Sequence, residues 1–354
     1  MKKVVALLMG VLILVTCITG CKTAPKVERP DVETRTITDM VGREVAVPVE
    51  VTSYVDLWYS HQSILAMLDV CEHMAFTSYE RDNAFCAWFF EMFPNVKESP
   101  IEEMNVEELL NLGVQVAFVQ YSERGDFAEE LEQAGIAAVA VDFDSYDSLM
   151  KSITMVADVL NTDEARNRAE QFNTELSKTM SDIGSAVSQI PDNERVRVLN
   201  LRNLETLRAD GADTVADAWI TACGGINVVA ADGLSGNQYL NAEQIFQWNP
   251  DIIFSSAAGD AEWVYAQSDY DSLSAVHNHR FYDNPSGIFY WNRYSAETIL
   301  QLKWASSLFY PERFEAEDIR QIIKDFYKEF YNYEISEENI DQMLKGLTPI
   351  GWGK

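Results

Sequence analysis

Residues 161–191 read NTDEARNRAEQFNTELSKTMSDIGSAVSQIP. The first four residues are typical of a helix N-terminus, because a capping side chain is followed by two acids that suit the helix dipole. Apolar residues then recur at steps of three or four, and Pro191 ends the pattern. The apolar positions are Ala165, Ala169, Phe172, Leu176, Met180, Ile183, Val187 and Ile190.

This pattern predicts one helix of unusual length. About 28 residues at 1.5 Å per residue give a rod of about 42 Å, which is longer than an ordinary globular helix. A single narrow apolar stripe suits a helix that lies across two lobes better than one buried in a single core. We therefore expect residues 161–191 to join two lobes, 36–160 and 192–354.

Strands and helices alternate on both sides of this helix. Such alternation favours βαβ units with mainly parallel sheets, so the predicted fold is α/β, with two Rossmann-like βα lobes joined by one long helix. A hairpin over Thr36–Pro48 opens the first lobe. The expected strands are Tyr54–Trp58, Met74–Thr77, Val114–Val119, Ala137–Val141, Val196–Leu201, Asp251–Phe254 and Phe281–Tyr282. The expected helices are His61–Cys71, Val106–Leu112, Phe127–Ala134, Thr214–Ala222, Asn241–Gln247, Ser295–Leu308, Ile319–Tyr331 and Glu337–Leu344.

The charge of the chain excludes some partners. Its 354 residues include 27 Lys+Arg and 56 Asp+Glu, a formal net charge of −29. A general nucleic-acid binder needs a basic footprint, which this composition lacks. The same charge argues against binding an anionic membrane through the protein surface.

The first twenty residues are typical of a secretory signal peptide. Met1-Lys2-Lys3 is basic, and Val4–Val15 is apolar but too short to span a membrane. Ile18-Thr19-Gly20-Cys21 resembles a bacterial lipobox, in which Cys21 is diacylated and becomes the new N-terminus; cleavage at an ordinary small-residue site is the alternative. We expect a signal peptide at 1–20, a tether at 21–35 and an extracytoplasmic protein that is lipid-anchored to the cell membrane.

Three cysteines remain in the mature domain. A bridge between Cys71 and Cys86 and free buried thiols are both compatible with the sequence, and Cys223 is left over.

A search for catalytic motifs favours a protein that is not an enzyme. The sequence contains no nucleophile elbow, no phosphate-binding P-loop, no dinucleotide fingerprint after a strand and no His-Glu-x-x-His. His277-Asn278-His279 is interpreted as a turn, because no Cys or further His lies near it.

The candidate ligand-binding residues follow the predicted strands, because ligands of open α/β sheets lie beyond the carboxyl ends of the strands. Aromatic faces bury a large flat ligand, and arginine binds carboxylates or oxyanions. His61 or Tyr121 is the candidate axial ligand if the cargo is heme, and the aromatic insert 85–93 is either a lid or local core. The candidates are Trp58, Tyr59, His61, Tyr79, Arg81, Tyr121, Arg124, Arg202, Arg208, Tyr290, Trp291 and Arg293.

Several short motifs, taken in order, resemble the class III substrate-binding proteins of ABC importers. Those proteins bind iron–siderophore chelates, heme, cobalamin or, in one branch, molybdate or tungstate. The resemblance covers about residues 35–345, and Gly113-Val114-Gln115 departs from the Pro-Asp common before that strand. The motifs are Thr36–Pro48, Asn105-Val106-Glu107-Glu108-Leu109-Leu110, Ala222-Cys223-Gly224-Gly225-Ile226-Asn227, Ala242-Glu243-Gln244-Ile245, Asn249-Pro250-Asp251-Ile252-Ile253, Trp304-Ala305 and Tyr310-Pro311.

The resemblance implies a function and a partner. It implies a monomeric receptor that closes two lobes over a metal chelate and delivers it to a membrane permease with its ATPase; a small oxyanion such as molybdate or tungstate is the alternative. The chelate is cargo, so no cofactor is expected. By the same resemblance, Glu107 and Glu243 are the permease-docking residues, with Glu108 as an alternative to Glu107.

Overall fold

The computed structural model describes residues 32–98, 105–314 and 318–352. The predicted signal peptide, Cys21 and the tether up to residue 31 lie outside the described residues. Within the part that is described, no helix is both long and apolar enough to cross a membrane.

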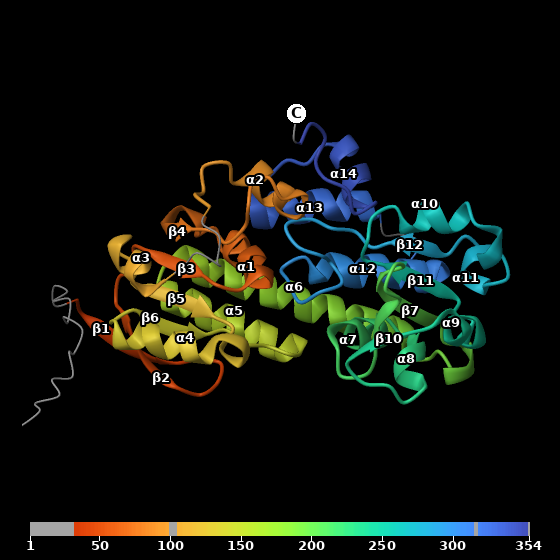
Figure 1. Ribbon diagram of the computed structural model, residues 1–354, viewed down its shortest axis with the longest axis horizontal. Coiled ribbons are helices and arrows are strands. Elements are labelled where there is room, and N and C mark those ends of the chain that lie inside the picture. The colour runs from red at the N-terminus through yellow and green to blue at the C-terminus, as the bar shows by residue number, and fades with distance from the viewer. Residues whose placement is uncertain (1–31, 99–104, 315–317, 353–354) are drawn as a thin grey trace, which may run out of the picture. The chain divides into compact units, whose positions relative to one another are not determined.

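The helix α6 (Asp163–Val187) runs past both halves of the described chain (Figure 1). Its 25 residues correspond to a length of about 37 Å, and the side chain of Thr162 caps its first turn by accepting the N–H of Ala165 at 3.1 Å. It packs on α5 (Tyr146–Leu160) in the first half and on α7 (Val215–Ala222) and α12 (Thr298–Phe309) in the second. The predicted linking helix is confirmed.

The N-terminal lobe contains a four-stranded sheet in the order β4-β3-β5-β6, and all of its strand pairs are parallel. A separate antiparallel hairpin, β1 with β2, precedes it as predicted. The strands are β1 (Thr34–Thr38), β2 (Glu44–Pro48), β3 (Tyr54–Asp56), β4 (Met74–Phe76), β5 (Val116–Val119) and β6 (Ala137–Ala140). The helices before α5 are η1 (Tyr59–His61), α1 (Gln62–Met67), η2 (Cys71–His73), η3 (Ala84–Cys86), α2 (Ala87–Met92), α3 (Val106–Asn111) and α4 (Tyr121–Gln133).

Two helices of this lobe differ from the prediction. The helix α4 begins at Tyr121 and not at Phe127, although its backbone is non-helical at Arg124; the carboxylate of Asp142 holds the additional first turn by accepting the N–H groups of Tyr121 at 2.6 Å and of Ser122 at 2.9 Å. A cap supplied from twenty residues away leaves no local signal. The helix α5, which the sequence analysis missed, begins with a capping box between Ser145 and Ser148.

The C-terminal lobe contains a six-stranded sheet in the order β10-β8-β7-β11-β12, with β9 also paired to β7. The pairs β7–β11, β11–β12 and β7–β9 are parallel, whereas β7–β8 and β8–β10 are antiparallel. The sequence analysis missed β8. Arg208 was expected in a loop after a strand, whereas it is the first residue of β8. The strands are β7 (Arg197–Asn203), β8 (Arg208–Asp210), β9 (Ile226–Asn227), β10 (Asn237–Tyr239), β11 (Ile252–Ser255) and β12 (Phe281–Asp283).

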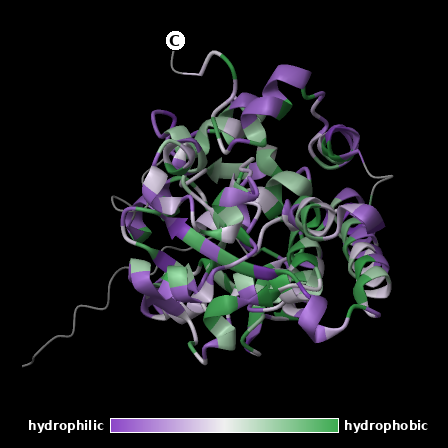
Figure 2. Ribbon diagram, turned by 90° about the vertical axis from the view of Figure 1, so that its right-hand side faces the viewer, coloured by the Kyte–Doolittle hydropathy of each residue, from purple (hydrophilic) through white to green (hydrophobic). Residues whose placement is uncertain are grey.

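The five predicted helices of the C-terminal lobe are found within a few residues, whereas α8, α10 and α11 were missed, and His277 ends α11 instead of lying in a turn. The end-on view of Figure 2 shows hydrophilic and hydrophobic residues alternating along the helices of the surface. Asn241 forms a capping box with Gln244 at the start of α9. The remaining helices are η5 (Asp192–Glu194), α8 (Val228–Ala231), α9 (Ala242–Trp248), α10 (Asp260–Tyr265), η6 (Ser268–Tyr270), α11 (Ser274–His277), η7 (Pro311–Arg313), α13 (Ile319–Tyr331) and α14 (Glu337–Met343).

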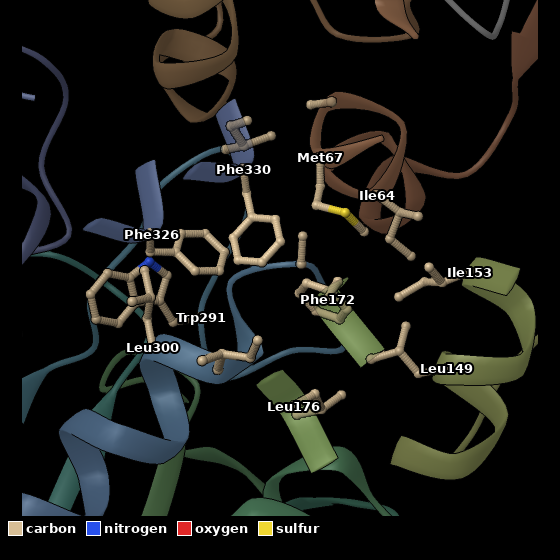
Figure 3. Close-up of a cluster of buried hydrophobic side chains, with 14 of the residues drawn as sticks. Ile64, Met67, Leu149, Ile153, Phe172, Leu176, Trp291, Leu300, Phe326 and Phe330 are labelled. Atoms are coloured by element: carbon tan, nitrogen blue, oxygen red, sulfur yellow. The ribbon is translucent and has the colours of Figure 1, made fainter. Parts of the chain in front are cut away.

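One hydrophobic core joins the two lobes. Figure 3 shows Ile64 and Met67 of α1 facing Phe172 of α6, with Phe326 and Phe330 of α13 beside them. Smaller clusters lie on other faces of the two sheets. Because the large cluster is continuous across the lobes, their relative movement has to deform close-packed side chains. Cys71, Cys86 and Cys223 are free thiols in this structure, so Cys71 and Cys86 are not bridged. All three are buried.

Candidate functional site

The segment between β12 and α12, residues 287–296, touches both lobes, and we call it the linking segment. The backbone N–H of Ala296 donates to Ser63 Oγ at 3.2 Å, and the hydroxyl of Tyr294 donates to the carbonyl of Asp144 at 2.6 Å. The linking segment carries the candidates Tyr290, Trp291 and Arg293. These contacts place them beside candidate residues of the N-terminal lobe.

Glu297 fixes one end of the linking segment from inside the core. Its carboxylate accepts the backbone N–H groups of Ile288 and Phe289, each at 2.9 Å, and the hydroxyl of Tyr327. Burial raises the pKa of Glu297 to about 7, although these three donors oppose the shift. At Gly287 a Cβ atom would collide with both Glu297 and Tyr327, so only glycine fits there.

Aromatic rings of the N-terminal lobe meet the linking segment at two places. Tyr59 packs on Tyr79 at 5.1 Å, and Phe85 packs on Tyr290 at 4.9 Å. The hydroxyl of Tyr79 donates to the carbonyl of Tyr59 at 2.8 Å and to that of Ile288 at 3.4 Å. Tyr59, Tyr79 and Tyr290 are thus brought together, with Phe85 between the lobes.

The second aromatic contact includes Trp58. Its ring lies 4.5 Å from that of Phe143, which in turn meets Tyr294 edge-on at 5.9 Å. Trp58 and Tyr294 are half-buried, so this contact lies at the edge of the core. The aromatic candidates therefore form two connected groups that both reach the linking segment.

The insert 85–93 is mostly core. Trp88, Phe89 and Phe90 are at most 3% exposed, whereas Phe85 is half-buried and touches Phe289 and Tyr290. Of the two readings of the insert, the structure supports local core for α2 and a contact between lobes for Phe85.

His61 lies in a fully buried pair with Asp56. Nδ1 of His61 is 2.7 Å from Asp56 Oδ2, and both side chains are 0% exposed. Among the described residues, no hydrogen-bond partner lies within reach of His61 Nε2. The ring stacks parallel to Trp58 with centroids 6.3 Å apart. A carboxylate at one ring nitrogen fixes the orientation of the ring and leaves the other nitrogen available.

Two of the three candidate arginines of the C-terminal lobe contact one buried carboxylate. Arg202 donates to Asp210 Oδ1 through Nε at 3.2 Å and Nη2 at 3.0 Å, and Arg293 Nη1 lies 3.3 Å from Asp210 Oδ2. The amide of Asn200 also donates to Asp210, at 3.1 Å. The side-chain amide of Asn292 donates to Asn200 at 3.1 Å and to Ser256 Oγ at 2.9 Å. Strands β7 and β8 thereby hold the arginines against the linking segment.

This cluster has more positive than negative charge. Burial lowers the pKa of Arg293, and the charges of Arg202 and Arg208 lower it further, whereas Asp210 raises it. Arg208 lies over the ring of Tyr239 at 5.9 Å, and its Nε has no hydrogen-bond partner among the described residues. Two guanidinium groups on one carboxylate, with Arg208 near enough to lower the pKa of Arg293, form a site suited to an anion.

Other candidates lie apart from this cluster. Arg81 donates to the backbone carbonyls of Pro94 and Val96, at 2.8 and 2.6 Å, and so holds its own loop. Tyr121 lies beneath the guanidinium of Arg43, at 4.2 Å, at the start of α4. Arg124 follows in the same helix.

Trp291 is not on the surface at all. It is 0% exposed and packs among core side chains that include Leu300 and Phe326 (Figure 3). We therefore expect substitution of Trp291 to act first on stability.

The two predicted docking acids occupy equivalent positions. Glu107 and Glu243 are both exposed, and each is the second residue of its helix, after the capping residues Asn105 and Asn241. Glu108 is half-buried in the same turn.

The sequence analysis missed several residues that organise the site. Asp210 and Glu297 are single acids among many, and nothing local distinguishes them. Asp56 had a usable signal, because it is the one acid within the apolar run Tyr54–Trp58. A surface hollow of about 700 Å³ lies elsewhere, between β1 and α5, and none of the candidates lines it.

The comparisons with known proteins agree with this architecture. The family model for periplasmic binding proteins matches residues 94–287. The chain is 19% identical over 332 residues to the molybdate-binding protein MolA of Haemophilus influenzae, covering 86% of this chain and 93% of that protein. It is 22% identical over 294 residues to the uncharacterized ABC transporter substrate-binding lipoprotein YvrC of Bacillus subtilis, covering 80% of this chain and 90% of that protein.

Solved structures show the same fold. A periplasmic solute-binding protein from Veillonella parvula superposes with a TM-score of 0.76 at 24% identity, covering 88% of this chain and 97% of that one. CeuE of Helicobacter pylori, solved with Ni(II) bound, has a TM-score of 0.67 at 19% identity, with 88% and 99% coverage. The chain belongs to the periplasmic binding protein family, as a class III substrate-binding component of an ABC importer.

Proposed function

We propose that the cargo of this receptor is an anion, held by the arginine cluster at Asp210 and covered by the aromatic rings of the other lobe. The pairing of Arg202 and Arg293 with one buried carboxylate, with the charge of Arg208 close to Arg293, is the observation that carries the proposal. In a chain with a net charge of −29, three neighbouring arginines with one acid between two of them are an exception to the overall balance.

The aromatic side chains favour a metal chelate as the cargo. Trp58, Tyr59 and Tyr290 are half-buried and lie on both sides of the contact between the lobes. Rings placed in this way bury the flat or greasy part of a siderophore, heme or corrinoid, while arginine binds its carboxylates or other anionic groups.

A small oxyanion is the second candidate. The relative MolA is named as a molybdate-binding protein, and the arginine cluster also contains neutral polar side chains, Asn200, Asn292 and Ser256. Several convergent donors around one anion suit a tetrahedral oxyanion.

The delivery step completes the proposal. Cys21 is diacylated and anchors the protein outside the cell membrane, as supported by the lipobox-like Ile18–Cys21 and by the lipoprotein relative YvrC. The exposed acids Glu107 and Glu243, one on each lobe, bind basic side chains of the permease.

Native mass spectrometry of the mature protein, with its absorption spectrum, tests the cargo. We expect an anionic ligand to co-purify or to bind from a panel of ferric siderophores, heme, corrinoids, molybdate and tungstate. Tight binding of a chelate with a visible absorption band supports the first candidate, and binding of molybdate or tungstate alone supports the second. A neutral or cationic ligand that binds equally well to Arg202→Ala would contradict the proposal.

A further inference from the structure

Three aromatic side chains meet at the surface of the C-terminal lobe, on α9, α10 and η6; α9 and α10 are labelled at the right-hand end of Figure 1. The rings of Phe246 and Tyr270 stack with centroids 6.2 Å apart, and Trp263 meets Tyr270 edge-on at 5.9 Å. Trp263 is 50% exposed and Phe246 is 36% exposed. We call these three residues the aromatic patch.

The chain around the aromatic patch carries negative charge only. Residues 209–279 contain no lysine or arginine, and Glu262, Asp269 and Asp271 flank Trp263 and Tyr270 in the sequence and are exposed. The acids of this stretch are Asp210, Asp213, Asp217, Asp232, Glu243, Asp251, Asp260, Glu262, Asp269 and Asp271.

The aromatic patch lies next to Glu243, the predicted docking acid of this lobe. Glu243 and Phe246 are three residues apart on α9, so they lie on the same side of the helix. An aromatic centre with a charged rim is the composition of a protein-binding surface, in which the buried rings supply affinity and the rim sets the association rate and the partner's charge.

Charge decides between the occupants of this surface. An anionic membrane and the same face of a second copy are both repelled by the exposed acids Glu262, Asp269 and Asp271 beside the rings. A protein face with lysines or arginines around an apolar contact is complementary to it. We infer that the aromatic patch is part of the docking surface for the importer's permease, where Trp263 and Phe246 bind apolar side chains beside a basic group that pairs with Glu243. This inference rests on the proposed function.

The N-terminal lobe offers a weaker counterpart. Near Glu107, Leu112 is 46% exposed, and no aromatic residue is among the exposed large hydrophobic side chains described in that lobe. Docking is therefore asymmetric, and the C-terminal lobe supplies most of the affinity.

The test uses the full-length mature protein and the purified permease–ATPase in lipid nanodiscs, with binding and stimulated ATP hydrolysis as readouts. We expect Trp263→Ala with Phe246→Ala to weaken docking at least tenfold and to leave cargo affinity unchanged. Asp269→Lys with Asp271→Lys, which leaves the rings in place, is expected to weaken docking in a salt-dependent way. Ile350→Ala, at a residue that is 57% exposed on another surface, is the matched control.

The outcomes separate this inference from the proposed function. If Glu243→Lys abolishes docking while both patch variants dock as tightly as the wild type, the inference is wrong and the proposed function stands. If the wild-type protein neither docks nor stimulates ATP hydrolysis, the proposed function fails and takes the inference with it. A dimer in sedimentation, or flotation with phosphatidylglycerol vesicles, that Trp263→Ala removes would also overturn the inference.

Discussion

The two lobes contribute different chemistry to the place where they meet. The N-terminal lobe presents rings, namely Trp58, Tyr59 and Phe85, and a single buried His61–Asp56 pair. The C-terminal lobe presents arginines gathered on Asp210. Rings bury area with little directional demand, whereas arginine selects charge and geometry. The proposed function therefore assigns cargo selection to the C-terminal lobe and covering of the cargo to the N-terminal lobe.

We expect the largest effect on stability from removing the Asp210 carboxylate. In Asp210→Ala, Arg202 and Arg293 lose a fully buried carboxylate, and breaking a buried pair in this way costs about 3–5 kcal/mol. We expect the free energy of unfolding, measured by urea denaturation, to fall by that amount. Glu205→Ala, an exposed acid between β7 and β8, is the control and is expected to change stability little. Equal losses in the two variants would show that Asp210 does not organise the arginines.

Glu297 gives the linking segment a pH dependence with a defined sign. Its pKa is raised from an ordinary 4.5 to about 7, so the folded protein holds this proton more tightly than the unfolded chain. Its contribution is therefore fully present below about pH 4.5 and is lost as the pH rises through about 7, a change on the order of 3 kcal/mol.

The variant Glu297→Gln isolates this contribution. Glutamine does not titrate, so the stability difference between wild type and variant should shift by that amount between pH 4.5 and 7.5 in urea denaturation. Glu205→Gln is the control for the many exposed acids. A pH-independent difference between wild type and Glu297→Gln would contradict the raised pKa.

Charge reversal at the two docking acids compares how much each lobe contributes to binding the permease. Glu107→Lys and Glu243→Lys are each expected to weaken binding to the permease, and the loss should be larger for Glu243→Lys if the aromatic patch lies beside it. For an exposed charge reversal we expect about 1–2 kcal/mol, mainly in the association rate and reduced by salt. Surface plasmon resonance at two salt concentrations measures both. Wild-type transport in the double variant would remove both residues from the docking surface.

The smallest expected effect concerns the contact between Tyr294 and Asp144. Tyr294→Phe removes a hydrogen bond of 2.6 Å between the lobes and leaves the ring in place, which should cost about 1 kcal/mol in thermal unfolding. Tyr239→Phe, at a ring that is 73% exposed within the C-terminal lobe, is the control. A loss no larger than that of the control would show that this contact does not hold the lobes.

Much of the fold follows from the sequence, because periodicity and caps are local. The linking helix, both α/β lobes and the hairpin at Thr36–Pro48 were predicted in this way. The start of α4 was predicted wrongly, since its cap comes from Asp142, and β8 was missed because three residues show too little alternation.

Fewer of the residues of the candidate site could be predicted from the sequence. Residue type and position after a strand identified Arg202, Arg208 and Arg293, which the structure brings together. The same rule also selected Arg81, which holds its own loop, and Trp291, which is core. Whether an arginine faces a shared carboxylate or a local carbonyl depends on long-range contacts that no window of sequence contains.

Calorimetry of cargo binding to wild type, Arg293→Lys and Arg202→Ala/Arg293→Ala tests the central claim most directly, with the anion found by native mass spectrometry as ligand. Lysine keeps the charge but not the paired geometry, so we expect the lysine variant to bind about tenfold more weakly and the double variant at least a hundredfold more weakly. Thermal unfolding of each free variant serves as the check on folding. Wild-type affinity in a folded double variant would contradict the assignment of anion binding to the C-terminal lobe.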